Sequence, residues 1–156
     1  MIRRNARRGM TLVELIVAFT ILLVLTSMAV PVARTNVRRM KERQLREAER
    51  ELRTAIDKYK DMADSGKLGI QKQDSYGYPE SLDALVEGVK GSGQAADTKL
   101  KFLRRIPLDP MTNTREWGLR SMQDDPKSIT WGGQNVFNVY TKTSDKAADG
   151  TPYAEW

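Results

Sequence analysis

Two stretches of opposite character open the chain. Residues 1–9 hold four arginines and no acidic side chain, whereas residues 15–33 are apolar apart from three hydroxyl residues. Nineteen such positions approach the about 20 that a helix needs to cross the hydrocarbon core of a bilayer. The pattern therefore predicts a basic leader over residues 1–9 and a membrane-spanning helix half over residues 10–33.

After residue 33 the apolar positions change to a spacing of three and four, which predicts an amphipathic helix half over residues 34–65. Its stripe consists of Leu45, Ala48, Leu52, Ile56, Tyr59 and Ala63. Glu42 with Arg46 and Glu49 with Arg53 form i,i+4 pairs of favourable orientation. This spacing suits either a coiled coil or a helix laid on a domain, and we favour the second. Pro31 predicts a bend near the end of the apolar half.

The remaining residues, 66–156, predict a small globular domain with an antiparallel sheet. Gly66 is expected to end the long helix. Pro79 is expected in the first turn of a short helix that stops at Gly88. The fold class is therefore α+β, with a long N-terminal helix packed on the domain.

Within this domain, turn residues and prolines separate two predicted strands from two loops. Residues 115–121 and 134–142 are rich in β-branched and aromatic side chains and predict strands, with a turn at 131–135. Residues 91–98 predict a flexible loop. The prolines in residues 102–110 exclude a central strand there and predict a packed loop. Its expected apolar anchors are Phe102, Leu103, Ile106 and Leu108.

Composition removes most catalytic and metal chemistry. The chain has no cysteine and no histidine. A disulfide, a thiolate or imidazole metal site and the usual histidine-assisted nucleophiles are therefore excluded. Its acidic residues form no recognisable catalytic pair, and we expect them to lie on the solvated surface. An enzyme is not expected.

The net charge of +6 is concentrated at the N-terminal end of the chain. Residues 34–60 carry ten basic and five acidic side chains, whereas residues 61–156 carry twelve basic and fourteen acidic ones. A basic surface that binds nucleic acid would spread over the folded domain. The charge pattern therefore argues against a nucleic-acid partner.

Glu14 stands at the start of the apolar segment and needs an explanation. A secretory signal peptide cut after Ala29, or an uncut anchor, would tolerate it as an oddity. A carboxylate among apolar surroundings nevertheless calls for a cationic partner. Cleavage between Gly9 and Met10 would create an α-amino group about one helical turn before Glu14. In staggered copies, that amine could pair with the Glu14 carboxylate of a neighbour.

These residues resemble a known motif. The stretch RRGMTLVEL is similar to the cleavage and methylation motif of type IV pilin-like precursors, with methionine where phenylalanine is usual. Pro31 stands where that family commonly has a helix-bending proline. The blocks YGYPESLDALVEG, FLRRIPLDPMTN and EWGLRS, with the final VYTKTSDKAADGTPYAEW, resemble the major pseudopilin of type II secretion systems.

The resemblance implies a structural subunit without catalysis. A prepilin peptidase would cut after Gly9 and N-methylate Met10, and Glu14 would act in assembly. The product would sit in the bacterial inner membrane with a periplasmic domain. It would join a homo-oligomeric periplasmic filament together with an assembly platform and minor pseudopilins. The alternatives are a type IV pilus or related filament subunit, and a secreted or anchored soluble binding domain with an ordinary signal peptide.

Two features depart from this family pattern. Major pseudopilins often bind calcium in the C-terminal loop, where this chain offers the carboxylates of Asp145 and Asp149. Two carboxylates predict a weak site, and an ordinary Asp-Gly turn is an equal alternative. Seven basic residues lie in residues 34–50 against four before Gly9, so the positive-inside rule favours the opposite orientation. The motif, and not the charge count, places the leader in the cytoplasm.

Overall fold

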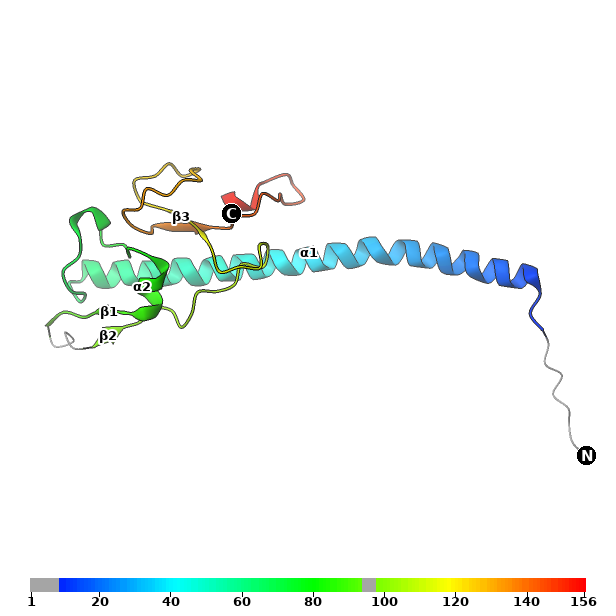
Figure 1. Cartoon of the computed structure of the whole chain (residues 1–156), viewed down its shortest axis with the longest axis horizontal. Helices are drawn as coiled ribbons and strands as arrows, with labels where there is room; N and C mark the ends of the chain where they lie inside the picture. The colour runs from blue at the N-terminus through cyan, green and yellow to red at the C-terminus, as the bar shows by residue number, and fades with distance from the viewer. Residues whose placement is uncertain (1–8, 94–97) are drawn as a thin grey trace, which may run out of the picture. The chain divides into compact units, whose positions relative to one another are not determined.

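The computed structural model describes residues 9–93 and 98–156, except for the side chains of residues 28–33. The long helix α1 (Leu12–Asp64) is followed by a small α+β region, as predicted (Figure 1). The other helical elements are η1 (Gln73–Ser75), α2 (Leu82–Glu87) and η3 (Tyr153–Glu155). The strands are β1 (Val89–Lys90), β2 (Lys99–Leu100), β3 (Gly118–Arg120) and β4 (Asn138–Tyr140). Two compact units, residues 1–40 and 41–156, divide the chain.

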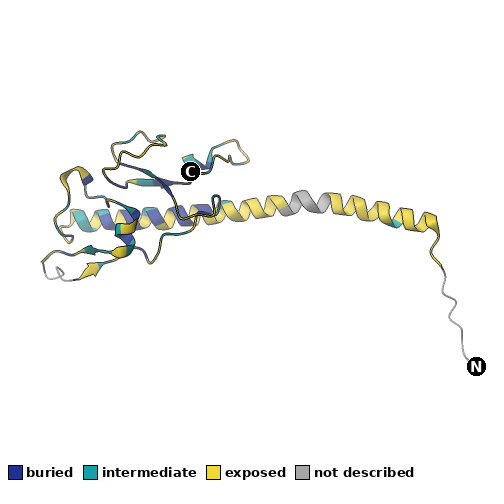
Figure 2. Cartoon of the chain, viewed as in Figure 1, coloured by how far each residue is buried: buried dark blue, intermediate teal, exposed yellow. Residues whose placement is uncertain are grey.

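In the first unit, the described apolar side chains of α1 are largely exposed (Figure 2). Leu12 is 75% exposed and Leu23 is 69% exposed. Within the described residues, no helical stretch combines the length and the apolar character that crossing a membrane requires. The predicted bend at Pro31 falls on residues 28–33, outside the described side chains, and stays a prediction.

In the second unit, the amphipathic part of α1 forms one wall of the core. Leu45, Leu52 and Ile56 are almost completely buried, which confirms the predicted stripe. Opposite them lie Leu85 from α2, Trp117 before β3 and Val139 from β4, all in one cluster. The helix is therefore laid on a domain, as we favoured. In the view of Figure 1, β3 and the β1–β2 hairpin lie on opposite sides of α1.

The C-terminal end of α1 is closed by backbone hydrogen bonds around Gly66. This glycine has φ +68°, in the left-handed region. Its amide donates to Ala63 O (3.0 Å), and the Lys67 amide donates to Met62 O (3.0 Å). Both bonds satisfy carbonyls that the last helical turn would otherwise leave unpaired. The predicted helix end at Gly66 is confirmed.

Helix α2 begins later than predicted, because Ser81 and not Pro79 sets its start. The Ser81 hydroxyl accepts a hydrogen bond from the Ala84 amide (3.2 Å), as an N-cap does. Pro79 lies outside the helix, and its carbonyl accepts the Val136 amide (2.7 Å). The placement of Pro79 in the first turn was wrong. The stop at Gly88 is confirmed, since Gly88 caps the helix through Ala84 O.

The loop predicted over residues 91–98 lies inside a hairpin that the sequence pattern did not reveal. β1 and β2 pair antiparallel, with Val89 opposite Leu100. Strands of two residues are too short to show an alternating pattern. The tip of the predicted loop, residues 94–97, lies outside the described residues.

The two predicted strands are present, in shorter form, as β3 and β4. They pair antiparallel, with Gly118 opposite Tyr140. The Tyr140 ring fills the space over Gly118, where a Cβ atom would lie 2.3 Å from the ring. Two residues further along β3, the Arg120 guanidinium lies 4.1 Å from the centroid of the same ring. Arg120 also donates to the carbonyls of Ser128 (2.8 Å) and Ala154 (3.2 Å), so it joins β3 to the loop at Ser128 and to η3.

Candidate functional site

The first turn of α1 has a defined start. Thr11 precedes the helix, and its hydroxyl accepts the backbone amide of Glu14 (3.3 Å). Thr11 and Glu14 thus stand at the N-cap and third positions, the spacing of a capping box. A carboxylate in the first turn also interacts favourably with the positive end of the helix dipole. This local role of Glu14 was not predicted, although the Thr-x-x-Glu spacing is a signal for it in the sequence.

The predicted processing positions lie just before this helix start. Gly9 and Met10 are outside α1, and Met10 is 61% exposed. A Cβ atom built on Gly9 would meet no other atom within 4 Å. A peptide bond that is exposed and non-helical is accessible to a peptidase.

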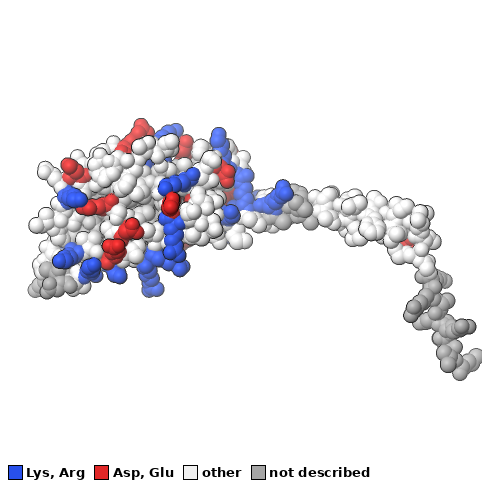
Figure 3. Space-filling view, viewed as in Figure 1, with Lys and Arg blue, Asp and Glu red and all other residues white. Residues whose placement is uncertain are grey.

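The apolar segment after Glu14 presents few polar groups. The hydroxyls of Thr20, Thr26 and Ser27 donate to the carbonyls of Ile16 (2.8 Å), Leu22 (2.7 Å) and Val24 (2.8 Å). These hydroxyls are therefore satisfied within the helix and can lie in apolar surroundings. In Figure 3 the described part of this segment is white, and one acidic group lies before it, near the start of the helix.

Glu14 is the only acidic residue among residues 1–41. Its neighbours Val13 and Leu15 are 68% and 46% exposed. Such an apolar surface requires cover by lipid or by other protein. A single carboxylate on it supplies one charged group through which a packed neighbour could be recognised.

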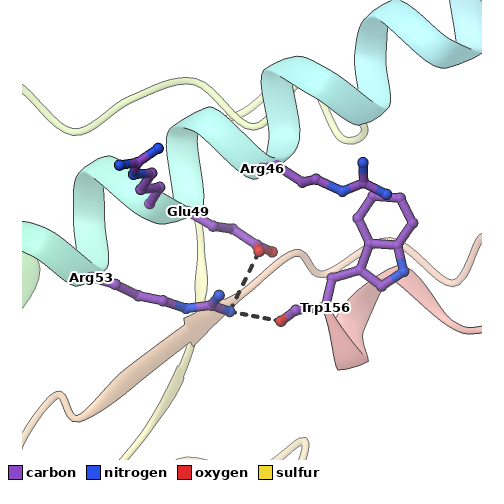
Figure 4. Close-up of a pocket in the computed structure, with 5 residues that line it drawn as sticks. Arg46, Glu49, Arg53 and Trp156 are labelled. Carbon is purple, nitrogen blue, oxygen red and sulfur yellow. Dashed lines mark hydrogen bonds and ion pairs between the residues drawn. The ribbon is translucent and has the colours of Figure 1, made fainter.

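A second cluster lies in the domain, where α1 meets the C-terminal segment (Figure 4). Arg53 donates to the main-chain oxygen of Trp156 (2.7 Å) and to Asn138 Oδ1 (3.0 Å). The Arg46 guanidinium lies 4.2 Å from the centroid of the Trp156 ring. An open pocket of about 350 Å³ lies here, lined by Arg46, Glu49, Arg50, Arg53 and Trp156. One turn away, the Tyr153 hydroxyl donates to Glu42 Oε1 (2.7 Å).

Glu49 is the unusual member of this cluster. Its side chain is 2% exposed, its Oε2 lies 3.4 Å from Arg53 Nη2, and its Oε1 has no hydrogen-bond partner. Burial raises the pKa of this carboxyl above its ordinary value, and Arg53 partly opposes the rise. The expectation that the acidic residues are solvated was wrong here. The i,i+4 spacing predicted the ion pair of Glu49 with Arg53, but it did not predict that Glu49 is buried.

A second buried acid, Asp109, orders the loop over residues 102–110. It is completely buried, and its carboxylate accepts from the Met111 amide (2.8 Å), the Thr112 hydroxyl (3.0 Å) and the Thr141 hydroxyl (2.6 Å). The prediction of a packed loop is confirmed, but one expected anchor was wrong, since Leu108 is 49% exposed. Asp109, and not Leu108, points into the domain. Its hydrogen bond with Thr141 joins this loop to the chain that follows β4.

The predicted calcium residues lie in a turn of the C-terminal loop. Asp149 Oδ1 accepts the Thr151 amide (2.9 Å), and the Asp145 carbonyl accepts the Tyr153 amide (3.2 Å). Residues 146 and 152 form an isolated bridge that closes the turn. In the parts of the chain that are described, no three acidic side chains gather as metal ligands would. These hydrogen bonds are those of an ordinary turn and add no support for a calcium site. Calcium binding at Asp145 and Asp149 stays a prediction.

Comparison with known protein families gives a match at the N-terminal end of the chain. Residues 4–30 match the family described as the prokaryotic N-terminal methylation motif. This match, with the long N-terminal helix and the small α+β domain, supports a type IV pilin-like subunit that a prepilin peptidase processes. The motif indicates a structural subunit anchored in a membrane. No curated protein and no solved structure matches the chain.

Proposed function

We propose that the chain is a structural subunit of a type II secretion pseudopilus. In this proposal a prepilin peptidase cuts after Gly9 and methylates Met10. The apolar part of α1 then holds the subunit in the inner membrane, with the domain in the periplasm. From there it assembles with further copies, minor pseudopilins and an inner-membrane assembly platform.

One observation carries the proposal: the exposed, non-helical bond between Gly9 and Met10 lies directly before the capped start of α1. The first turn of this helix contains Glu14, the only acidic residue among residues 1–41. This order is what cleavage and assembly require. A new α-amino group at Met10 would lie at the helix start, and Glu14 would offer its carboxylate about one turn further on. The methylation-motif match covers the same residues.

Intact mass and N-terminal sequencing of the protein purified from membranes test this processing. We expect a chain that starts at N-methylated Met10. A Gly9→Val variant should keep the leader, because the peptidase would lose its glycine. A mature chain that starts at Val30 would instead show an ordinary signal peptide and overturn the proposal.

The choice between a secretion pseudopilus and a type IV pilus rests on the stretch RRIPLDP, residues 104–110, and on the absence of cysteine. The buried Asp109 supports a structural role for the aspartate of this stretch. Deletion of the gene in its native host, followed by assays of exoprotein release and of surface pili, distinguishes the two. Loss of release with normal pili supports the pseudopilus, and loss of pili alone supports the pilus.

Calcium at Asp145 and Asp149 is a separate proposal. If these carboxylates hold the ion, an Asp145→Asn/Asp149→Asn variant should melt at the same temperature with calcium and with chelator, while the parent chain should melt lower with chelator. An equal melting temperature for the parent chain under both conditions removes the two residues from consideration.

A further inference from the structure

Three exposed arginines follow the apolar segment of α1. Arg34, Arg38 and Arg39 lie in the first compact unit, and all three are exposed. We call them the arginine collar. No acidic residue occurs between Glu14 and Glu42, so basic side chains are the only charged groups in this part of the helix. Figure 3 shows basic groups gathering on the helix beyond the residues drawn in grey.

The distance between Glu14 and the collar along the helix matches the thickness of the hydrocarbon core of a bilayer. Arg34 follows Glu14 by twenty positions in the same helix. At about 1.5 Å per residue this separation is about 30 Å, the thickness of a typical hydrocarbon core. If Glu14 lies at one membrane surface, Arg34 reaches the opposite surface. Long arginine side chains also extend readily toward headgroups.

The collar opposes the orientation that the proposed function requires. Basic residues beside an apolar span favour the cytoplasmic side. In a processed precursor, however, the collar lies on the translocated side. Three basic side chains on the translocated side oppose insertion, and an attraction at the membrane surface would offset part of that cost. Anionic lipid headgroups supply one, since each basic residue near an anionic surface strengthens binding about fivefold.

We propose that the arginine collar binds anionic phospholipid headgroups on the outer face of the inner membrane. The inference rests on the proposed membrane-anchored function and adds a partner to it. The collar would gather such lipids around the point where the helix leaves the bilayer. Guanidinium groups suit this role because they bind phosphate oxygens in a bidentate manner.

Energy transfer in vesicles tests the lipid preference with the full chain. Since the chain has no cysteine, Asn36→Cys places one fluorescent label inside the collar. Vesicles of equimolar phosphatidylcholine and phosphatidylglycerol carry a trace of either lipid with an acceptor on an acyl chain, so that both headgroups stay unmodified. We expect at least about threefold more acceptor near the label for phosphatidylglycerol, and less of this excess at high salt.

The collar variant Arg34→Gln/Arg38→Gln/Arg39→Gln should lose the excess, because glutamine keeps the helix but removes the charges. The matched control Arg104→Gln/Arg105→Gln/Arg115→Gln removes three exposed arginines of the domain and should keep it. An excess retained in the collar variant overturns the inference. So does a collar variant that loses filament assembly while its lipid preference is unchanged, because the arginines would then serve a protein contact.

Failure of the proposed function gives a different result. If the full chain does not float with vesicles of either lipid, membrane anchoring is wrong, and the lipid inference falls with it. If the chain floats but shows no preference between the two lipids, only the lipid inference is overturned. Flotation is therefore measured on every variant before the energy transfer.

Discussion

The carboxylate of Glu49 lies 3.4 Å from Arg53 Nη2, and this ion pair is almost closed to solvent on the glutamate side. The pair differs from an ordinary i,i+4 surface pair because Arg53 also holds the main chain at Trp156. One oxygen of Glu49 remains without a hydrogen-bond partner. Burial of a charge that is incompletely paired costs free energy, so the pair orders the C-terminal segment at the expense of stability.

Arg53→Ala should destabilise the domain by about 2 kcal/mol. The substitution removes the cation that is paired with the buried Glu49 carboxylate, and breaking a fully buried pair in this way costs about 3–5 kcal/mol. The effect is smaller here because the Arg53 side chain is 37% exposed. Urea unfolding of the full chain in detergent measures the change. Arg50→Ala is the control, since Arg50 lines the same pocket and is exposed; it should change stability by less than about 0.5 kcal/mol.

Removal of both charges should recover most of this loss. In Glu49→Leu/Arg53→Met, an apolar pair of similar volume replaces the ions, so no buried charge is left unpaired. The double variant should unfold at a higher urea concentration than Arg53→Ala. If both variants are equally unstable, the loss comes from the Arg53 bonds to Asn138 and Trp156 and not from the stranded carboxylate.

Glu49 should also make stability depend on pH in an unusual direction. Because burial raises its pKa above the ordinary 4.5, the folded state holds a proton that the unfolded state has lost between 4.5 and the raised value. The contribution of Glu49 is therefore fully favourable below pH 4.5 and is lost as the pH rises through the folded pKa. Relative to Glu49→Gln, the parent chain should gain stability as the pH falls from 7 to 4.5. Unfolding of both chains across this range measures the difference, and a difference that does not change with pH contradicts the assignment.

Asp109→Ala should cost about 3 kcal/mol, because the Met111 amide and the Thr141 hydroxyl lose their acceptor in a buried place. The melting temperature of the full chain is the measurement. Asp61→Ala, which removes an exposed carboxylate of α1, is the control and should change it little. If the two variants have the same melting temperature, the hydrogen bonds of Asp109 do not stabilise the loop.

If Glu14 pairs with the α-amino group of a neighbouring copy, Glu14→Ala should leave membrane insertion intact and impair filament assembly, because that amine loses its partner. Membrane fractionation and electron microscopy of sheared filaments measure the two steps. Glu14→Gln separates charge from capping, since glutamine can also fill the third position of a capping box. If Glu14→Gln assembles as the parent chain does, the carboxylate charge is not needed. Glu116→Ala, an exposed acid of the domain, should assemble normally.

Periodicity predicted the long helix well because burial on one face leaves a regular mark. Leu45, Leu52 and Ile56 recur with helical spacing and are buried as expected. Turn chemistry was equally informative at Gly66 and Gly88, where the chain needs a left-handed or open conformation. The processing motif could be recognised because its residues are contiguous, so no folding is needed to bring them together.

The buried acids could not be predicted, because their burial depends on contacts between distant segments. Asp109 meets Thr141 across 32 positions, and Arg53 meets Trp156 across 103. No local pattern records such pairings, and a single aspartate in a loop has the same sequence character whether it is solvated or enclosed. Pro79 was misplaced for a related reason: its bond with Val136 competes with the local preference of proline for a first helical turn.

The absence of a side chain at Gly118 has a consequence for engineering this subunit. A methyl group there would displace the ring of Tyr140, on which the Arg120 guanidinium rests. Arg120 in turn fixes the carbonyls of Ser128 and Ala154, so the disturbance would spread to the loop at Ser128 and to η3, which are far apart in sequence. Libraries that diversify the domain for display on a filament should therefore keep position 118 invariant and place their variation on the exposed residues around Ile129.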